Sequence, residues 1–399
     1  MGMALVSTPA TTNRSGRITN SPIGKINVKC NRLSQAFTTR WSFFETSAGV
    51  YSASRLAELD ELISFNRANG INVIFGMYGT PTFYANSVAN NPNYPDSVTL
   101  GPWGDLGEGA NPTSLTPVTN YVNMIMTRYN TAGGAWGAAD SGNGQTNFER
   151  YGRGIKYWET GNEPNFTNGN GNVTGSGAAG SGFWWGTAAQ FSDYCYTQHA
   201  AIKAIDSGCT VLCAGFSPSG TGTFTTHFST VGSITGKTGA EACDWYNYHQ
   251  YGYATLGMRL EDANRNFLSG AVGIQTFKNA VLAGGWNRPF AITEEGWDEA
   301  APTVTTTAFE NASPTYRYQW YARRFMHYAA FGCQSIHPWN WGSLNNSNSA
   351  NWQDDVEGAQ RAYNEAVSNL SGKTILPSSY RLPQGVTRLN FSDGTFWEV

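Results

Sequence analysis

Two glutamates in this sequence stand where short strand-like runs end. Glu163 lies in the segment Tyr157–Pro164, which reads YWETGNEP, and Glu294 lies in Phe290–Trp297, which reads FAITEEGW. Because proline cannot extend a strand ladder, Glu163 is predicted at the carboxyl end of its strand. Two carboxylates on one rim can hold opposite charge states, since burial and the neighbour's charge keep one protonated while hydrogen bonds keep the other ionised. That pairing fits the hydrolysis of glycosidic bonds.

Two other glutamates compete for these roles. Glu295 adjoins Glu294, but side chains alternate between the two faces of a strand, so the pair should face opposite ways. Glu159 shares a face with Glu163 and lies deeper in the strand, so we interpret it as a buried partner in a polar network. A strand-end carboxylate without further context is more often a structural hydrogen-bonding group or a metal ligand than a catalytic group.

The chain around these motifs alternates short β-branched or aromatic runs with helical stretches, which is typical of a parallel α/β sheet. The predicted strands are Ile71–Met77, Gly154–Thr160, Cys209–Gly215, Cys243–Tyr248, Pro289–Glu294 and Cys333–Trp339. The predicted helices are Ser54–Asn69, Pro117–Tyr129, Trp185–Ile205, Ile274–Leu282, Thr315–Phe331 and Val356–Leu370. The region Ile26–Phe44 is expected to supply another strand or two. Because no G-x-G-x-x-G or P-loop motif directly follows any strand, we favour a (β/α)8 TIM barrel over an open doubly wound sheet.

Two long inserts interrupt this alternation after the third and fourth barrel strands. Tyr84–Pro117 and Gly169–Gly182 are rich in Gly, Asn and Pro. Loops that follow strands form the functional face of a barrel, so the inserts are expected beside the site. We expect one catalytic barrel over residues 1–375 and a β-like C-terminal tail over residues 376–399 packed on it.

Composition limits the partners of the protein. Charged residues make up 13% of the chain, the net charge is −3 and no basic stripe is present, which argues against nucleic acid and anionic membranes. No stretch approaches the ~18 consecutive apolar residues of a membrane-spanning helix. Aromatic residues reach 14%, which suits stacking on neutral rings, although a large aromatic core would explain the same number. No Cys or His set has metal-ligand spacing, so no metal or cofactor is expected.

The two glutamate motifs together resemble the hallmarks of the clan A glycoside hydrolases, the retaining (β/α)8 enzymes. Asn162–Pro164 is similar to the Asn-Glu-Pro after strand 4 of that clan, and Thr293–Trp297 to the Thr-Glu-x-Gly-Trp after strand 7. The text around Gly49–Tyr51 and Gly79–Pro81 is most similar to glycoside hydrolase family 39, with family 5 next. The resemblance covers roughly residues 26–345.

The resemblance implies roles for residues near the predicted strand ends. It makes Glu163 the acid/base, Glu294 the nucleophile and Asn162 the residue that hydrogen-bonds the sugar 2-hydroxyl. His249 and Tyr251 match the His-x-Tyr that the clan often carries on strand 6. The phenol would hold the nucleophile ionised, and the imidazole would contact the sugar or the acid/base.

Aromatic and basic residues complete the expected site. Trp339 or Trp341 matches the tryptophan under the reactive sugar after strand 8, and Trp297 would add an outer subsite. The clan also has an arginine on strand 2 that bonds the nucleophile. Lys29, Arg32 and Arg40 compete for this role, and we choose Arg40.

These residues predict a retaining glycosidase that cleaves β-linkages of an oligo- or polysaccharide by double displacement, with endo action favoured by the long inserts. The alternatives are an exo-acting enzyme such as a β-xylosidase, a glycan-binding barrel without activity and, more weakly, a metal-dependent barrel hydrolase. The first residues, Met1–Ala10, lack the charged and apolar regions of a signal peptide, and a secreted or periplasmic location is an expectation only. The oligomeric state leaves no signal in the sequence.

Overall fold

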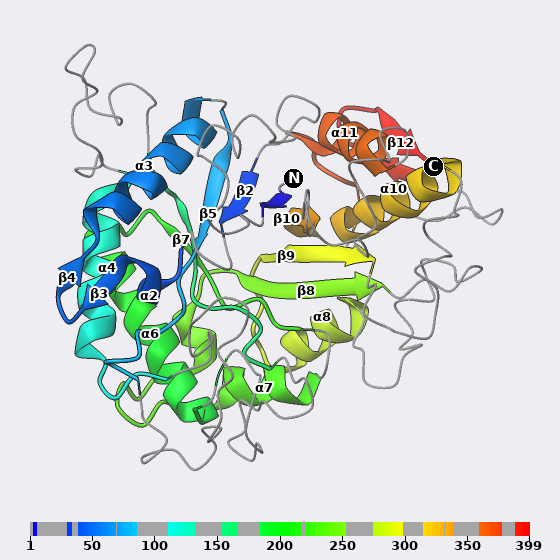
Figure 1. Ribbon diagram of the computed structural model, residues 1–399. Coiled ribbons are helices and arrows are strands. Elements are labelled where there is room, and N and C mark those ends of the chain that lie inside the picture. The colour runs from blue at the N-terminus through cyan, green and yellow to red at the C-terminus, as the bar shows by residue number, and fades with distance from the viewer. Residues whose placement is uncertain are drawn as a thin grey trace, which may run out of the picture.

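Parallel strands form the centre of the molecule, and helices pack around them (Figure 1). The structure is a computed structural model. It describes residues 3–5, 30–33, 39–68, 70–85, 111–131, 154–165, 184, 186–217, 221–252, 274–297, 314–330, 332–338, 359–376 and 388–399.

Eight of the described strands are parallel and pair in two sheets. The first sheet has the order β1 (Met3–Leu5), β2 (Cys30–Leu33), β5 (Asn72–Gly76), β6 (Tyr157–Glu159) and β7 (Thr210–Leu212). The second has the order β10 (Cys333–Pro338), β9 (Phe290–Trp297) and β8 (Tyr246–Gly252). Parallel bridges from Leu212 to Trp245 and from Phe216 to Tyr248 link the sheets on one side, and β1 lies beside β10 on the other.

The helices follow the strands along the chain. They are α2 (Trp41–Phe44), α3 (Ala53–Ala68), α4 (Thr116–Tyr129), α6 (Ala188–Ile205), α7 (Thr221–Ser229), α8 (Ile274–Ala283), α10 (Pro314–Ala330) and α11 (Ala359–Leu370), with a 3₁₀ turn η3 (Gly239–Ala242). A short antiparallel hairpin, β3 (Glu45–Ser47) and β4 (Val50–Tyr51), precedes α3. All six predicted strands and all six predicted helices are present within a few residues of their expected ends, so the expected α/β organisation is confirmed. The pairing among described residues is not that of one closed ring.

Alternation along the strands separates two apolar clusters. Val73 and Phe75 of β5 belong to the large cluster that includes the helices, for example Leu59 and Ile63 of α3. Ile74, between them, points to the opposite side. There it meets side chains from three other strands, namely Cys30 of β2, Leu212 of β7 and Ala291 of β9. Strands of both sheets therefore share one inner apolar layer.

The C-terminal tail contains an antiparallel pair, β11 (Arg388–Asn390) and β12 (Phe396–Glu398). Its Leu389, Phe391 and Trp397 are buried in the large apolar cluster. Ile375 bridges to Phe391, so backbone pairing crosses the boundary expected at residue 376. The division into a barrel and a tail stays a prediction.

Several expectations fall outside the described residues. These include most of the insert 84–117, which is described only at 84–85 and 111–117, and all of the insert 169–182. All six cysteines have free thiols. In the part of the chain that is described, no helix is both long and apolar enough to cross a bilayer.

Candidate active site

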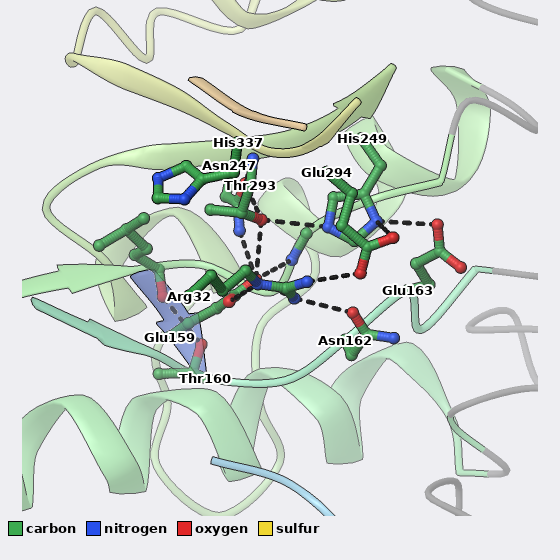
Figure 2. Close-up of polar contacts among 12 residues, drawn as sticks. Arg32, Glu159, Thr160, Asn162, Glu163, Asn247, His249, Thr293, Glu294 and His337 are labelled. Carbon is green, nitrogen blue, oxygen red and sulfur yellow. Dashed lines mark hydrogen bonds and ion pairs between the residues drawn. The ribbon is translucent and has the colours of Figure 1, made fainter. Parts of the chain in front are cut away.

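Four of the parallel strands contribute side chains to one buried polar cluster (Figure 2). We call it the strand-end cluster, and it consists of Arg32 from β2, Glu159, Asn162 and Glu163 from and after β6, Asn247 and His249 from β8, and Thr293 and Glu294 from β9. At most 8% of the surface of any of these residues is exposed. A buried charged group is stable only when partners satisfy it, so the contacts within the cluster define its charge state.

Arg32 is the centre of the cluster. Its Nη1 donates to Glu294 Oε1 at 2.5 Å, and its Nε and Nη2 donate to the two oxygens of Glu159 at 2.5 and 2.8 Å. Nη2 also donates to Asn162 Oδ1 at 2.8 Å. Burial alone would lower the pKa of this guanidinium, but Glu159 and Glu294 raise it above its ordinary value. Arg32 is therefore a buried cation that is paired with both glutamates.

Sequence reasoning chose Arg40 as the arginine that bonds Glu294, but the structure has Arg32 in this contact. Arg40 lies beyond β2, where its backbone forms a parallel bridge with Tyr78. The sequence contains a feature that favours Arg32 for this contact. An arginine inside a buried strand requires carboxylate partners, and the strand-end motifs supply them.

Glu159 has the position expected of a buried network partner. Besides the two contacts from Arg32, its Oε1 accepts from Asn247 Nδ2 at 2.5 Å, from Gly215 N at 3.2 Å and from the Thr293 hydroxyl at 3.2 Å. The side chain is fully buried. A carboxylate with all its oxygens occupied in this way cannot reach a ligand.

Glu163 and Glu294 face one another across His249. The imidazole Nδ1 lies 2.8 Å from Glu163 Oε1 and 3.4 Å from Glu294 Oε2. The ligand atoms of the three residues lie within 4.8 Å of one another. Glu163 has a φ of 35°, in the left-handed region that non-glycine residues seldom occupy, and its N–H donates to Gly215 O at 2.8 Å. Such strain concentrates at functional sites, where the surrounding structure enforces it.

His249 is held in its neutral form. Burial first, and then the positive charges of Arg32 and His337, place the pKa of its imidazole well below the ordinary value. A neutral ring has one donor and one acceptor nitrogen. The ring therefore has one proton to donate and one lone pair with which to accept.

Asn162 has a buried amide donor that no described residue satisfies. Its Oδ1 accepts from Arg32, which fixes the orientation of the amide. Its Nδ2 is buried and has no hydrogen-bond partner among the described residues. A buried amide donor without a partner costs about 1–3 kcal/mol, which a bound hydroxyl oxygen would offset.

Thr293 and Asn247 were missed by sequence reasoning. The pairing of β8 with β9 shifts between Tyr248 and His249, so that Thr293 and Glu294 together oppose His249. This β-bulge turns two successive side chains of β9 toward the same cluster. Strict alternation cannot predict such a bulge from the sequence.

Four of the predicted substrate-binding side chains cannot be placed. Tyr251 and Trp297 belong to β8 and β9, but only their backbones are described. Trp339 and Trp341 lie outside the described residues. Their contacts with a sugar stay predictions. The side chain of Glu295, the alternative to Glu294, is not described either, so its expected orientation away from Glu294 also stays a prediction.

The trio Glu163, His249 and Glu294 also has the composition of a metal site. Two features favour a hydrogen-bonded cluster instead. The distance of 2.8 Å between His249 Nδ1 and Glu163 Oε1 is a hydrogen-bond length, and Arg32 already provides a positive charge beside Glu294. The arrangement suits acid–base and nucleophilic chemistry by two carboxyl groups.

Comparison with known proteins bears on the fold. No protein-family model and no curated protein matches the sequence. A glucosidase from Croceicoccus marinus has a TM-score of 0.59 at 14% identity, over 97% of this chain and 71% of that one. A family 39 glycoside hydrolase from the gut symbiont Bacteroides cellulosilyticus WH2 has a TM-score of 0.53 at 14% identity, over 99% and 68%. A GH30 endoxylanase from Clostridium papyrosolvens C71 has a TM-score of 0.53 at 12% identity, over 94% and 74%.

The chain therefore shares the fold of glycoside hydrolases. The resemblance to clan A glycoside hydrolases that the two glutamate motifs carry is confirmed at the level of the fold.

Proposed function

We propose that this protein is a retaining glycoside hydrolase in which Glu294 is the nucleophile and Glu163 the acid/base. One observation carries the proposal: an oxygen of Glu163 and an oxygen of Glu294 lie within 4.8 Å of one another. Carboxyl groups of retaining enzymes are ~5–5.5 Å apart, whereas inverting enzymes need more than ~6.5 Å to admit a water. The spacing supports double displacement.

The two roles follow from the different surroundings of the glutamates. The contact from Arg32 keeps Glu294 ionised, which suits the attack on the anomeric carbon. Glu163 lies beside the neutral His249 and donates a proton to the leaving oxygen. A glycosyl ester on Glu294 results. Glu163 then removes a proton from water, which attacks the same carbon, and the configuration is retained.

Asn162 is proposed to bind the sugar 2-hydroxyl. Its Nδ2 is the donor without a described partner, and Arg32 fixes its direction. Hydrogen bonds to the 2-hydroxyl strengthen in the transition state of glycoside hydrolysis.

We also propose that the eight parallel strands close into a barrel. The inner layer of Cys30, Ile74, Leu212 and Ala291 supports closure, because it takes side chains from strands of both sheets. Layers built from alternate strands are typical of the interior of (β/α)8 barrels.

Endo action on a β-linked polysaccharide is the proposed mode. Phe83 supports it, since this aromatic residue follows β5 and is 44% exposed, where it can stack on a sugar outside the reactive site. Exo action, as in a β-xylosidase, is the alternative. Digestion of xylans, β-glucans and galactans separates the two modes. Endo action releases a ladder of oligosaccharides early, whereas exo action releases one small product throughout.

The catalytic roles are tested by azide rescue of Glu163→Ala and Glu294→Ala on an aryl β-glycoside. Glu163→Ala should regain activity with azide and give a product of retained configuration, while Glu294→Ala should give an inverted glycosyl azide. Glu241→Gln, at an exposed glutamate that pairs with Lys237 outside the cluster, is the matched control and should keep wild-type activity. Full activity of Glu163→Ala on a polymer without azide would exclude the assignment, and glycan binding without turnover by the wild type would favour a non-catalytic barrel.

Export from the cytoplasm is a separate proposal, because a polysaccharide cannot enter a cell intact. Fractionation of cells that express the full-length gene tests it, and recovery of all the protein in the cytoplasm would contradict it.

A further inference from the structure

The Thr293 hydroxyl contacts three polar groups at once (Figure 2). Its Oγ1 lies 2.8 Å from Asn247 Oδ1, 3.2 Å from Glu159 Oε1 and 3.1 Å from His249 Nε2. A hydroxyl has one proton to donate. The direction of that proton therefore decides which nitrogen of His249 is protonated.

The neighbours of Asn247 fix the orientation of its amide. Its Nδ2 donates to Glu159 Oε1 at 2.5 Å and to the Cys213 carbonyl at 3.3 Å, and both of these oxygens can only accept. Its Oδ1 accepts the Thr293 backbone N–H at 3.3 Å. The amide oxygen therefore faces the Thr293 hydroxyl.

Two acceptor oxygens, from Asn247 and Glu159, thus face Thr293 Oγ1. If the hydroxyl donated to His249 Nε2 instead, contacts of 2.8 and 3.2 Å would join oxygens with no hydrogen between them. The proton must point at one of these oxygens, so the hydroxyl offers a lone pair to Nε2. His249 then carries its ring proton on Nε2 and donates it to Thr293.

The other ring nitrogen, Nδ1 of His249, is then an acceptor. It lies 2.8 Å from Glu163 Oε1, and two lone pairs at that distance repel unless a proton lies between them. The neutral ring cannot supply this proton, and Arg32 holds Glu294 as a carboxylate. The charged and titratable groups around the ring are Arg32 on β2, Glu159 and Glu163 on and after β6, Glu294 on β9 and His337 on β10. Of these, only Glu163 is placed to donate to Nδ1.

We propose that Thr293 is a positioning residue that fixes His249 in the Nε2–H tautomer and thereby keeps the proton of the resting site on Glu163. The inference rests on the proposed function, because it assigns the resting protonation of the same two glutamates. In the reaction the proton passes from Glu163 to the leaving oxygen, and Glu163 recovers one from the water that completes the cycle. The bulge at Thr293 is what brings this hydroxyl to the ring.

Thr293→Val tests the proposal, since it removes the hydroxyl and keeps the shape. Without it the Nδ1–H tautomer becomes favourable, donates to the Glu163 carboxylate and lowers the pKa of the acid. The basic limb of the kcat/KM profile should move to lower pH by about one unit, because one hydrogen bond is worth about tenfold in an ionisation equilibrium. Above that limb, substrates with poor leaving groups should lose activity more than dinitrophenyl glycosides, which need little acid assistance. Thr293→Ser keeps the hydroxyl and should keep the wild-type profile.

A basic limb that stays in place in folded Thr293→Val overturns the proposal. A direct readout in the wild type does not depend on the folding of any variant. In ¹⁵N-histidine spectra, the His249 signal, assigned by its loss in His249→Gln, should show Nε2 protonated and Nδ1 bare. The opposite tautomer overturns the proposal even if the enzyme is active. Absence of glycosidase activity in the wild type would instead refute the proposed function. The ¹⁵N spectrum would still test which nitrogen of His249 is protonated.

Discussion

His227 should limit the stability of this protein in acid. It lies on α7 with its side chain fully buried, and the rings of Phe191, Phe216 and Phe228 surround it. Neither ring nitrogen has a hydrogen-bond partner among the described residues. Burial therefore lowers the pKa of this imidazole from 6.5 to about 3.

The direction of the pH effect follows from the proton count. Below pH 6.5 the unfolded chain binds a proton at His227, while the native chain does not bind it until the pH approaches 3. The folded state is therefore at a growing disadvantage as the pH falls through this window. Between pH 7 and pH 5 the difference amounts to about 2 kcal/mol of unfolding free energy from this one residue.

Urea unfolding of the wild type and of His227→Phe, each at pH 7 and pH 5, measures the effect. The wild type should lose about 2 kcal/mol more than the variant between the two pH values. The comparison isolates His227 because other histidines with a lowered pKa, such as the half-buried His327, titrate in both proteins. Phe228→Leu, in the same aromatic cluster, should lower the free energy of unfolding equally at both pH values. An equal loss with pH in the wild type and in His227→Phe would refute the reasoning.

Two further predictions concern the strand-end cluster. Arg32→Met leaves Glu159 and Glu294 buried without their cation, so it should destabilise the fold by about 3–5 kcal/mol and raise the pKa of the proposed nucleophile. Denaturant unfolding measures the loss of stability, and the acidic limb of the pH–activity profile reports the change in pKa. An unchanged unfolding midpoint would contradict the predicted loss of stability. Asn162→Ala should lower kcat/KM by about tenfold to a hundredfold on a substrate with a 2-hydroxyl and have little effect on the 2-deoxy analogue, and an equal loss on both would exclude the proposed contact.

Sequence patterns predicted the strands that carry the site because their signals are local. Tyr157–Glu159 and Phe290–Trp297 combine β-branched or aromatic residues with a clear stop, and the structure has strands there. The same reasoning placed Glu163 and Glu294 at strand ends; Glu163 follows β6, whereas β9 continues to Trp297, so Glu294 lies within its strand. The helix Thr221–Ser229 was missed, since its Gly, Thr and Ser residues favour turns. Packing of Phe224 and Phe228 against the core helps to stabilise it.

The partners within the site were harder to predict because they depend on geometry between strands. Spacing along the chain did not separate Arg32 from Arg40, whereas register does: Arg32 pairs with Ile74 within the sheet, and Arg40 lies beyond it. The role of Thr293 depends on a one-residue bulge between β8 and β9. Both facts come from pairing between strands that are distant in sequence, which a single sequence does not record.

The position of Glu159 explains how the cluster stays balanced through the proposed reaction. The net charge of the cluster at rest is −1, because two carboxylates and one guanidinium are charged while the imidazole and the protonated Glu163 are neutral. A negative site suits a transition state with positive character at the sugar. When Glu294 becomes an ester it loses its charge, and Glu163 becomes a carboxylate after giving up its proton, so the sum is again −1. Arg32 would lose one partner at that moment, and the bidentate contact with Glu159 is what keeps the cation paired. A buried arginine that contacted the nucleophile alone would have no anionic partner in the ester intermediate. The proposed mechanism therefore requires a second carboxylate that stays charged throughout.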